Sequence, residues 1–308
     1  MNTIKIFLYS LPILIFVVVV TKRDLSKNEL GSVSNPVKLF FTPSVDAQSI
    51  TSNAKKLTDF LEKETGYYFT TAVPTSYIAV VEALGSNRCD IAAINTFNYL
   101  LAYEKYKAKA LLKVIRDNNE QTYRGEFVAK AGSGIEKIED LQGKKIAYVD
   151  PSSISGYILP KALLEKKNIK EGEIVFGMKH DNVITMVYQN QVDAGAAFYC
   201  RPDPKTGRFL DARVRVVKQF PDVGEKVKII ALTEEIPNDP VIFRAGLPDE
   251  MVDKIVDGIL KFVSTEEGAK AMYEIYYVTG FARTKDSDYD PVRKMLKDLN
   301  INLSEAAK

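Results

Sequence analysis

From residue 37 onward, short apolar stretches alternate with longer segments in which apolar residues recur every three or four positions. Short apolar stretches bounded by polar turns predict buried strands, and the longer spacing predicts amphipathic helices that pack on them. In the first part of the chain we expect strands at 37–41, 67–73, 90–94 and 110–116, alternating with helices at 47–64, 78–84 and 95–106.

The alternation begins again near residue 126. We expect strands at 126–132, 145–150, 173–176 and 192–199, and helices at 138–145, within 152–167 and at 181–190. Two further strands, 214–220 and 227–233, could return the chain to its first half, and helices follow at 249–263, 265–277 and 291–299. Strand–helix alternation of this kind predicts an α/β fold with parallel sheets and right-handed crossovers.

The two sets resemble each other locally. Residues 83–94 and 188–198 both run from a helix end through a polar turn and an Asp into a strand of small residues. We therefore expect two similar lobes with a ligand cleft between them, because open parallel sheets bind ligands beyond the carboxyl ends of their strands. The expected division is an N-terminal segment at 1–34, a first lobe at 35–117 and 225–308, and a second lobe at 118–224.

An uncharged apolar stretch lies between Lys5 and Lys22. Its length falls between a secretory signal core of about 7–15 residues and a membrane span of about 20. No A-x-A cleavage motif follows, and no cysteine nearby could carry a lipid. A buried core helix fits poorly, because the next dozen residues are polar and linker-like. We expect export by a signal peptide or a retained membrane anchor, and hence a periplasmic or cell-surface location.

Charge and composition narrow the range of functions. The 308 residues include 42 basic and 40 acidic side chains, a formal net charge of +2 and one histidine. This balance argues against nucleic-acid binding, which needs clustered basic residues. Cys89 and Cys200 have no CxxC partner or histidine cluster, so we expect no metal site and no cofactor. We favour two free, buried thiols over a disulfide between them.

The most informative segment is DPSSISGYILP at 150–160, which follows an expected strand and opens a helix. The unpaired N–H groups and the dipole at a helix start favour a negative charge. Ser152, Ser153 and Ser155 add hydroxyl donors, and Gly156 lets an oxyanion approach the backbone. Ordinary N-capping is the alternative, because serine is common before helices. Three serines together with a glycine favour an anion site.

The histidine, His180, lies just after the strand at 173–176 and at the start of the next helix. In an anion cleft, a protonated imidazole would donate to the ligand and balance its charge. An exposed histidine at a helix start is the alternative. Ser44 and Thr96 follow strands of the first lobe, so the fold would place them at the same cleft.

Several segments together resemble the phosphonate/phosphite/phosphate-binding proteins of ABC transporters, a PhnD-like family. They are VDPSSISGYILPKALL, KHDNVITMVYQNQVDAGAAF and IPNDPVIFR, with SYIAVVEAL and CDIAAIN in the first lobe. The resemblance covers roughly residues 37–290. It implies a type II periplasmic-binding-protein fold, with two α/β lobes, crossover strands acting as a hinge, and a ligand cleft.

The resemblance also implies roles for individual residues. Ser153, Ser155 and Gly156 match the turn that holds the phosphonate oxygens, and His180 matches a histidine that contacts them. Tyr77 matches a cleft tyrosine of the first lobe. Asp239, on a rigid segment between two prolines, matches a carboxylate that can pair with a ligand amino group, although a simple turn residue is the alternative.

Three positions depart from the family pattern. Ile154 replaces a threonine of the usual Ser-Thr-Ser-Gly turn and removes a hydroxyl donor. Ile94 and Cys200 stand where aminophosphonate binders can place an aromatic and an acidic residue. The anion half of the expected pocket is mostly intact and the amine half is reduced, so the resemblance implies a phosphorus oxyanion ligand without specifying its organic group.

The resemblance therefore implies an extracytoplasmic solute-binding protein of an ABC importer, which captures a phosphonate, phosphite or related oxyanion and delivers it to permease subunits. We expect a monomer, attached to a membrane only through its N-terminal segment, and no enzymatic activity. One alternative is an anchored ligand sensor with the same fold. Another is a hydrolase using Ser155, His180 and Asp193, although the chain has no GxSxG motif.

Overall fold

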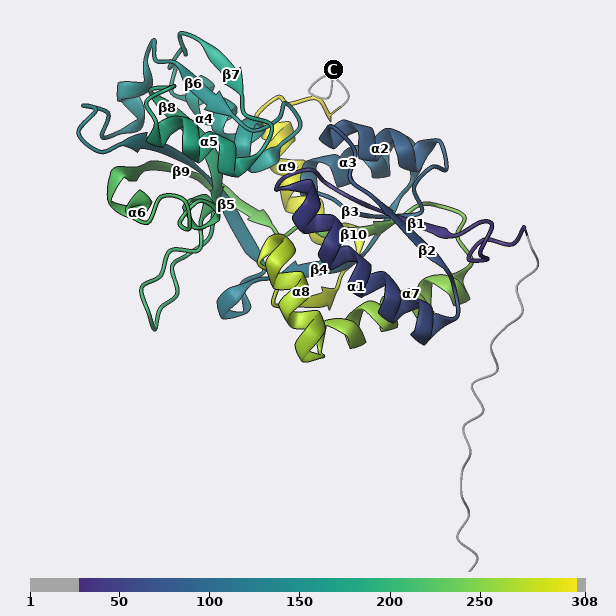
Figure 1. Cartoon of the computed structure of the whole chain (residues 1–308). Helices are drawn as coiled ribbons and strands as arrows, with labels where there is room; N and C mark the ends of the chain where they lie inside the picture. Colours follow the sequence, from purple (N-terminus) through teal and green to yellow (C-terminus); the bar gives the residue numbers. More distant parts are fainter. Residues whose placement is uncertain (1–27, 304–308) are drawn as a thin grey trace, which may run out of the picture.

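Two β-sheets, each covered by helices, organise residues 28–303, which are the residues that the computed structural model describes (Figure 1). The expected signal peptide or anchor falls on residues 1–27 and lies outside the described residues. Within 28–303, no helix combines the length and the apolar character needed to cross a membrane.

The first lobe is built on a six-stranded sheet with the order β11-β4-β10-β3-β1-β2. Its strands are β1 (Val37–Phe41), β2 (Phe69–Ala72), β3 (Ile91–Ala93), β4 (Lys109–Ile115), β10 (Pro240–Phe243) and β11 (Gly280–Arg283). β1 pairs in parallel with β2 and β3, whereas β10 is antiparallel to β3 and β4, and β11 is antiparallel to β4. The sheet is therefore mixed, whereas parallel sheets were expected, because two strands from the C-terminal part of the chain enter it in the opposite direction.

Two layers of helices cover this sheet. They are α1 (Ala47–Thr65), α2 (Tyr77–Gly85), α3 (Thr96–Tyr106), α7 (Asp249–Val263), α8 (Glu266–Tyr276) and α9 (Asp290–Asp298). α1, α7 and α8 bury one apolar cluster against the strands, and α2, α3 and α9 contribute to a second. The Asp46 side chain accepts a hydrogen bond from the Ser49 amide, which fixes the start of α1 at a strand end that borders the cleft.

The second lobe is built on a five-stranded sheet with the order β7-β6-β8-β5-β9. Its strands are β5 (Thr122–Lys130), β6 (Ile146–Tyr148), β7 (Ile174–Phe176), β8 (Ala194–Tyr199) and β9 (Val227–Pro237), and its helices are α4 (Leu159–Lys166), α5 (His180–Tyr188) and α6 (Val223–Lys226). β6 is parallel to β7 and β8, whereas β5 is antiparallel to β8 and β9. This sheet is also mixed.

The expected strand at 214–220 is wrong. The chain forms a 3₁₀ turn at Ala212–Arg215, where the Asp211 side chain accepts a hydrogen bond from the Arg213 amide. The alternation of Val214 and Val216 with arginines imitates a strand, but both valines are buried on the turn instead. The local cap at Asp211 therefore overrides the two-residue pattern.

The chain passes between the sheets twice, at residues 116–121 and at residues 238–239. The fully buried side chain of Asn238 ties the two passages together, because its amide donates to the carbonyls of Val114 (3.0 Å) and Glu120 (2.8 Å). The expected strand at 227–233 forms, but as part of β9 it pairs with β5 in the second sheet. The chain re-enters the first sheet only at Pro240, and the exact lobe boundaries stay a prediction.

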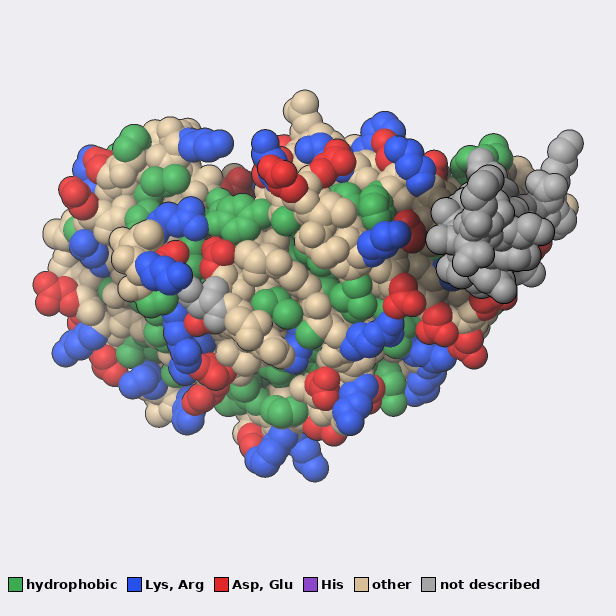
Figure 2. Space-filling view, turned by 90° about the horizontal axis from the view of Figure 1, so that it is seen from below, with side chains coloured by type: hydrophobic (Ala, Val, Ile, Leu, Met, Phe, Trp, Pro, Cys, Tyr) green, Lys and Arg blue, Asp and Glu red, His purple; other side chains and the backbone are tan. Residues whose placement is uncertain are grey.

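The two lobes also touch directly beside the cleft. Ile154 and Ile158 of the second lobe belong to the same apolar cluster as Phe97 and Leu101 of α3. On the surface, Lys and Arg side chains are interspersed with Asp and Glu over the face shown in Figure 2. This mixed surface agrees with the small net charge of the chain.

Candidate ligand-binding site

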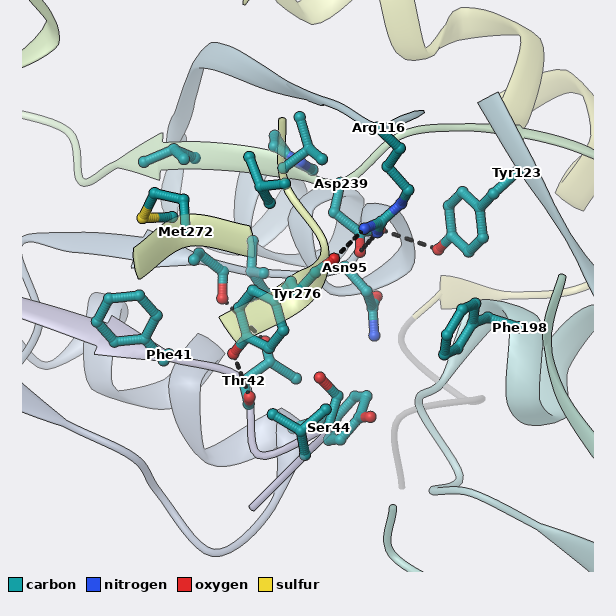
Figure 3. A pocket seen from close by; sticks show the side chains of 18 of the residues that line it. Phe41, Thr42, Ser44, Asn95, Arg116, Tyr123, Phe198, Asp239, Met272 and Tyr276 are labelled. Atoms are coloured by element: carbon teal, nitrogen blue, oxygen red, sulfur yellow. Dashed lines mark hydrogen bonds and ion pairs between the residues drawn. The ribbon is translucent and has the colours of Figure 1, made fainter. Parts of the chain in front are cut away.

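A cavity lies between the two lobes, next to both passages of the chain. Its lining includes polar side chains from both lobes: Ser44, Tyr77, Asn95, Arg116, Tyr123, Ser153, Ser155, His180, Arg215, Asp239 and Tyr276. Figure 3 shows how Arg116, Asp239 and Tyr123 gather on one side of it, with Phe198 facing them. Six of the nine residues expected from the sequence are in this lining: Ser44, Tyr77, Ser153, Ser155, His180 and Asp239.

The turn that carries Ser152, Ser153 and Ser155, which we call the serine turn, is held rigidly at the cavity. Ser153 precedes a short π-helical turn at Ile154–Ile158, and its hydroxyl accepts a hydrogen bond from the Gly156 amide at 3.1 Å. Among residues 28–303, no side-chain hydrogen bond engages the hydroxyl of Ser155. A side chain at Gly125 of β5 would approach the Ser155 carbonyl to 2.6 Å, so this glycine lets the turn pack closely on the strand. The turn therefore presents the Ser155 hydroxyl to the cavity.

The other three expected residues are not in the cavity lining. The Ser152 hydroxyl donates to Asp150 at 2.8 Å, and the Thr96 hydroxyl donates to the Pro237 carbonyl at 2.9 Å. The Gly156 amide is occupied by Ser153, and a side chain at Gly156 would collide with Val149. The geometry gives these residues structural roles: they shape the turn and fix α3 to the end of β9.

Burial favours a neutral His180 imidazole, whereas the sequence led us to expect a protonated one once an anion is bound in the cleft. Burial, assisted by the positive charges of Arg215 and Arg116, lowers the pKa of His180 to about 3. Its Nδ1 atom accepts a hydrogen bond from the Phe198 amide at 3.2 Å. In a neutral imidazole the proton must then be on Nε2, so His180 remains a hydrogen-bond donor without carrying charge.

Tyr77 and Tyr276 form the first-lobe wall of the cavity. The Tyr276 hydroxyl donates to the Thr42 carbonyl at 2.6 Å (Figure 3). The hydroxyl of the buried Tyr77 makes no hydrogen bond within the described part of the chain, although the Ser44 side chain lies beside it. Burial raises the pKa of Tyr77 well above its ordinary value, so its hydroxyl is protonated and can donate to a ligand.

Two arginines supply the positive charge, and sequence reasoning missed both. Arg116 begins the first passage between the lobes, directly after β4, and Arg215 ends the 3₁₀ turn of the second lobe. Arg116 could have been suspected, because it ends an expected strand, as the other candidate residues do. Arg215 was hidden inside a segment expected to be a strand. Burial lowers the pKa of Arg215 to about 10, which still leaves it charged at neutral pH.

Asp239 lies on the second passage, and its carboxylate already has two partners within the protein. The Tyr123 hydroxyl donates to its Oδ1 at 2.9 Å, and Arg116 Nη2 lies 3.6 Å from its Oδ2 (Figure 3). Burial raises the pKa of Asp239, and the charge of Arg116 and the Tyr123 hydrogen bond oppose that shift. The carboxylate keeps 28% of its side-chain surface accessible, so it faces the cavity while it serves as the partner of Arg116.

The cysteines are confirmed as free and buried. Cys200 packs in the interlobe apolar cluster, and burial raises its pKa to about 12. Ile94 lines the cavity with an apolar surface. Within residues 28–303, no group of three or more histidine, cysteine or acidic side chains is arranged to hold a metal ion.

Two lobes on mixed sheets, joined by two passages and enclosing a polar cavity, define a type II periplasmic binding protein. Among solved structures, a binding protein component of a phosphonate ABC transporter from Pseudomonas aeruginosa is similar, with a TM-score of 0.74, 20% identity and 89% coverage of each chain. PhnD1 from Prochlorococcus marinus, in complex with methylphosphonate, gives a TM-score of 0.71 at 16% identity, covering 86% of this chain and 98% of that one.

Sequence comparison identifies the family. The profile of the periplasmic substrate-binding proteins of phosphonate ABC transporters matches residues 39–289, and the chain belongs to this family. The phosphate-import protein PhnD of Mycolicibacterium smegmatis is 26% identical over 282 residues, covering 83% of this chain and 84% of that one. The phosphonates-binding periplasmic protein of Escherichia coli is 22% identical over 242 residues, covering 76% and 68%. The chain is thus a substrate-binding component of an ABC importer, with an extracytoplasmic location.

Proposed function

We propose that the interlobe cavity binds a phosphorus oxyanion, with its oxygens held by Ser153, Ser155 and His180. The observation that carries this proposal is that the uncharged donors of Ser153, Ser155 and His180 line one cavity together with two guanidinium groups. Hydrogen bonds to charged groups contribute about 1.5–3 kcal/mol each. Three such bonds approach the roughly 8 kcal/mol that micromolar affinity requires.

Tyr77 and Ser44 would cover the ligand from the first lobe. Both side chains belong to the first lobe and line the cavity. A bound ligand would bridge the two lobes and stabilise the closed arrangement, in which Asn95 and Asn98 of the first lobe donate to the Ser152 carbonyl at 3.2 and 3.1 Å. The closed protein would then present a defined surface to the permease subunits.

The cavity is suited to binding and release, not to catalysis by a serine hydrolase mechanism. A nucleophile–base–acid system needs an acid that orients the base. Here the Phe198 amide occupies His180 Nδ1, while the Asp193 carboxylate accepts the Lys145 amide at 2.8 Å. We propose that the protein acts as a monomer without enzymatic activity, and that its N-terminal segment directs export or anchors it to the membrane.

Isothermal titration with phosphate, phosphite, methylphosphonate and sulfate tests the proposed ligand class. At least one phosphorus oxyanion should bind, and nuclear magnetic resonance should recover it unchanged after incubation. Replacing Ser155→Ala together with His180→Ala should weaken that binding at least tenfold, and Ser52→Ala on the exposed face of α1 should leave it unchanged. Unaltered affinity in the double variant would overturn the site assignment, and turnover of the ligand would contradict a pure binding role.

A further inference from the structure

Arg116 and Arg215 are further donors at the cavity that come from outside the serine turn, and both lie close enough to His180 to lower its pKa. Both come to the C-terminal end of α8, where Arg116 Nη1 donates to the Tyr276 carbonyl (2.5 Å) and Arg215 Nη1 donates to the Ile275 carbonyl (3.0 Å). A helix C-terminus carries a partial negative charge, so it holds the two guanidinium groups in place. We call Arg116 and Arg215 the arginine pair.

The arginine pair has donors that the protein does not use. A guanidinium has five N–H groups, and the Nε atoms of Arg116 and Arg215 are buried without a partner in the described part of the chain. Within residues 28–303, Arg215 has no carboxylate at ion-pair distance, and its guanidinium lies over the Tyr277 ring at 4.2 Å. Asp181 attracts Arg215 only from a longer distance and does not line the cavity. Buried N–H groups without a partner are costly, which indicates that a ligand completes this part of the site.

Carboxylate acceptors, in contrast, are scarce in the described lining of the cavity. Asp239 is the single carboxylate in the described lining, and Tyr123 and Arg116 already occupy it. Ile94 offers no acceptor, and Cys200 is buried in an apolar cluster. An ammonium group would have to displace Arg116 and would stand beside two guanidinium groups. A carboxylate or a second phosphoryl group would instead receive charge-assisted hydrogen bonds, for which the planar fork of arginine is well suited.

We propose that the preferred ligand carries a second anionic group, joined by a short linker to the phosphoryl group, and that the arginine pair binds it. This inference rests on the proposed function, because it takes the serine turn as the site of the phosphoryl group. It distinguishes the protein from a receptor for zwitterionic aminophosphonates, and it makes a phosphonocarboxylate a better ligand than an alkyl phosphonate of similar size.

The test compares three ligands that share the phosphonate group: phosphonoacetate, methylphosphonate and 2-aminoethylphosphonate. Isothermal titration should show phosphonoacetate binding at least tenfold more tightly than methylphosphonate, and 2-aminoethylphosphonate binding most weakly. In Arg215→Gln the preference for phosphonoacetate over methylphosphonate should fall towards one, while methylphosphonate affinity changes much less. Arg283→Gln, which removes an exposed arginine of β11, is the matched control and should keep the preference.

Arg215→Lys is a second variant that keeps the inference testable if Arg215→Gln fails to fold. It keeps the charge and loses the planar fork, so the preference should be intermediate, and thermal unfolding shows whether each variant is folded. Equal affinity for phosphonoacetate and methylphosphonate, tightest binding of 2-aminoethylphosphonate, or an equal loss for both anions in Arg215→Gln would overturn the inference and leave the proposed function intact. Absence of binding for all phosphorus oxyanions would instead overturn the proposed function.

Discussion

Two sets of donors line the cavity, which we call the serine end and the arginine end, and they are built in different ways. The serine end comes from one turn of the second lobe, in which Ser153 caps the π-helical segment and Ser155 faces the cavity. The arginine end is assembled from distant parts of the chain. They are Arg116 directly after β4, Arg215 in the second lobe, the carboxylate of Asp239 and the end of α8. The serine end is therefore preorganised within one lobe, and the arginine end depends on how the lobes meet.

This difference assigns different tasks to the two ends. A rigid turn of uncharged donors can capture an oxyanion on the second lobe alone. The arginine end includes Arg116 and Asp239, which lie on the two passages between the lobes, so its geometry must change if the lobes move apart. Substitutions at the serine end should thus affect ligands in general, and substitutions at the arginine end should affect selectivity.

The largest effect is expected at the serine end. Replacing Ser153→Ala and Ser155→Ala together removes two hydrogen bonds to the ligand, each contributing about 1.5–3 kcal/mol. Methylphosphonate affinity should fall about a hundredfold or more, as measured by isothermal titration. Ser153→Ala alone should also lower the melting temperature, because Ser153 caps the turn, whereas Ser155→Ala should not. A double variant that binds normally would place the oxyanion elsewhere.

The next largest effect is the contribution of His180 to the pH dependence of the free energy of unfolding. The pKa of folded His180 is about 3, below its ordinary value of 6.5, so between these pH values the unfolded chain binds the additional proton. Acidification through this window therefore destabilises the fold, by at most about 1.4 kcal/mol per pH unit. His180→Asn retains an acceptor for the Phe198 amide and removes this contribution. Urea unfolding of both proteins from pH 7 to pH 4 should show a weaker pH dependence for the variant.

The comparison with the variant is necessary because another buried group titrates in the opposite direction. Burial raises the pKa of Glu126 well above its ordinary value, so its contribution to stability falls as the pH rises. The contribution of Glu126 is the same in the unmodified protein and in His180→Asn, so it cancels in the difference between their free energies of unfolding. Identical pH profiles for the two proteins would contradict a neutral, buried His180.

The same division separates what the sequence predicts from what it does not. Features encoded in consecutive residues were predictable, and features assembled from distant segments were not. β1, α1 and the serine turn were predictable, because a strand pattern, a cap and a cluster of hydroxyls are each written in consecutive residues. β10 and β11 were not, since each is four residues long and is stabilised by pairing with strands formed much earlier in the chain. Arg215 was missed for the same kind of reason: only tertiary packing brings it to the end of α8.

A smaller effect is expected from Asp239→Asn. The asparagine can still accept the Tyr123 hydrogen bond, but a negative charge facing the cavity is lost, and charges a few ångströms apart interact by about 1–4 kcal/mol near a protein surface. Methylphosphonate should bind about three to ten times more tightly by isothermal titration. Glu234→Gln, an exposed change on β9, should have no effect. Selective loss of 2-aminoethylphosphonate binding would instead show that Asp239 accepts an ammonium group.

The smallest effect is expected at Ile154, the hydrophobic residue that replaces the usual threonine in the serine turn. Its side chain is fully buried in the apolar cluster that joins the lobes, so it stabilises their contact and does not face the ligand. Ile154→Val should cost about 0.5–1.5 kcal/mol of packing and weaken methylphosphonate binding a fewfold. Ile154→Thr has nearly the same shape as the valine variant but buries a hydroxyl, so it should bind more weakly than Ile154→Val. Titration of this pair is decisive, because tighter binding by the threonine variant would mean that position 154 donates to the oxyanion after all.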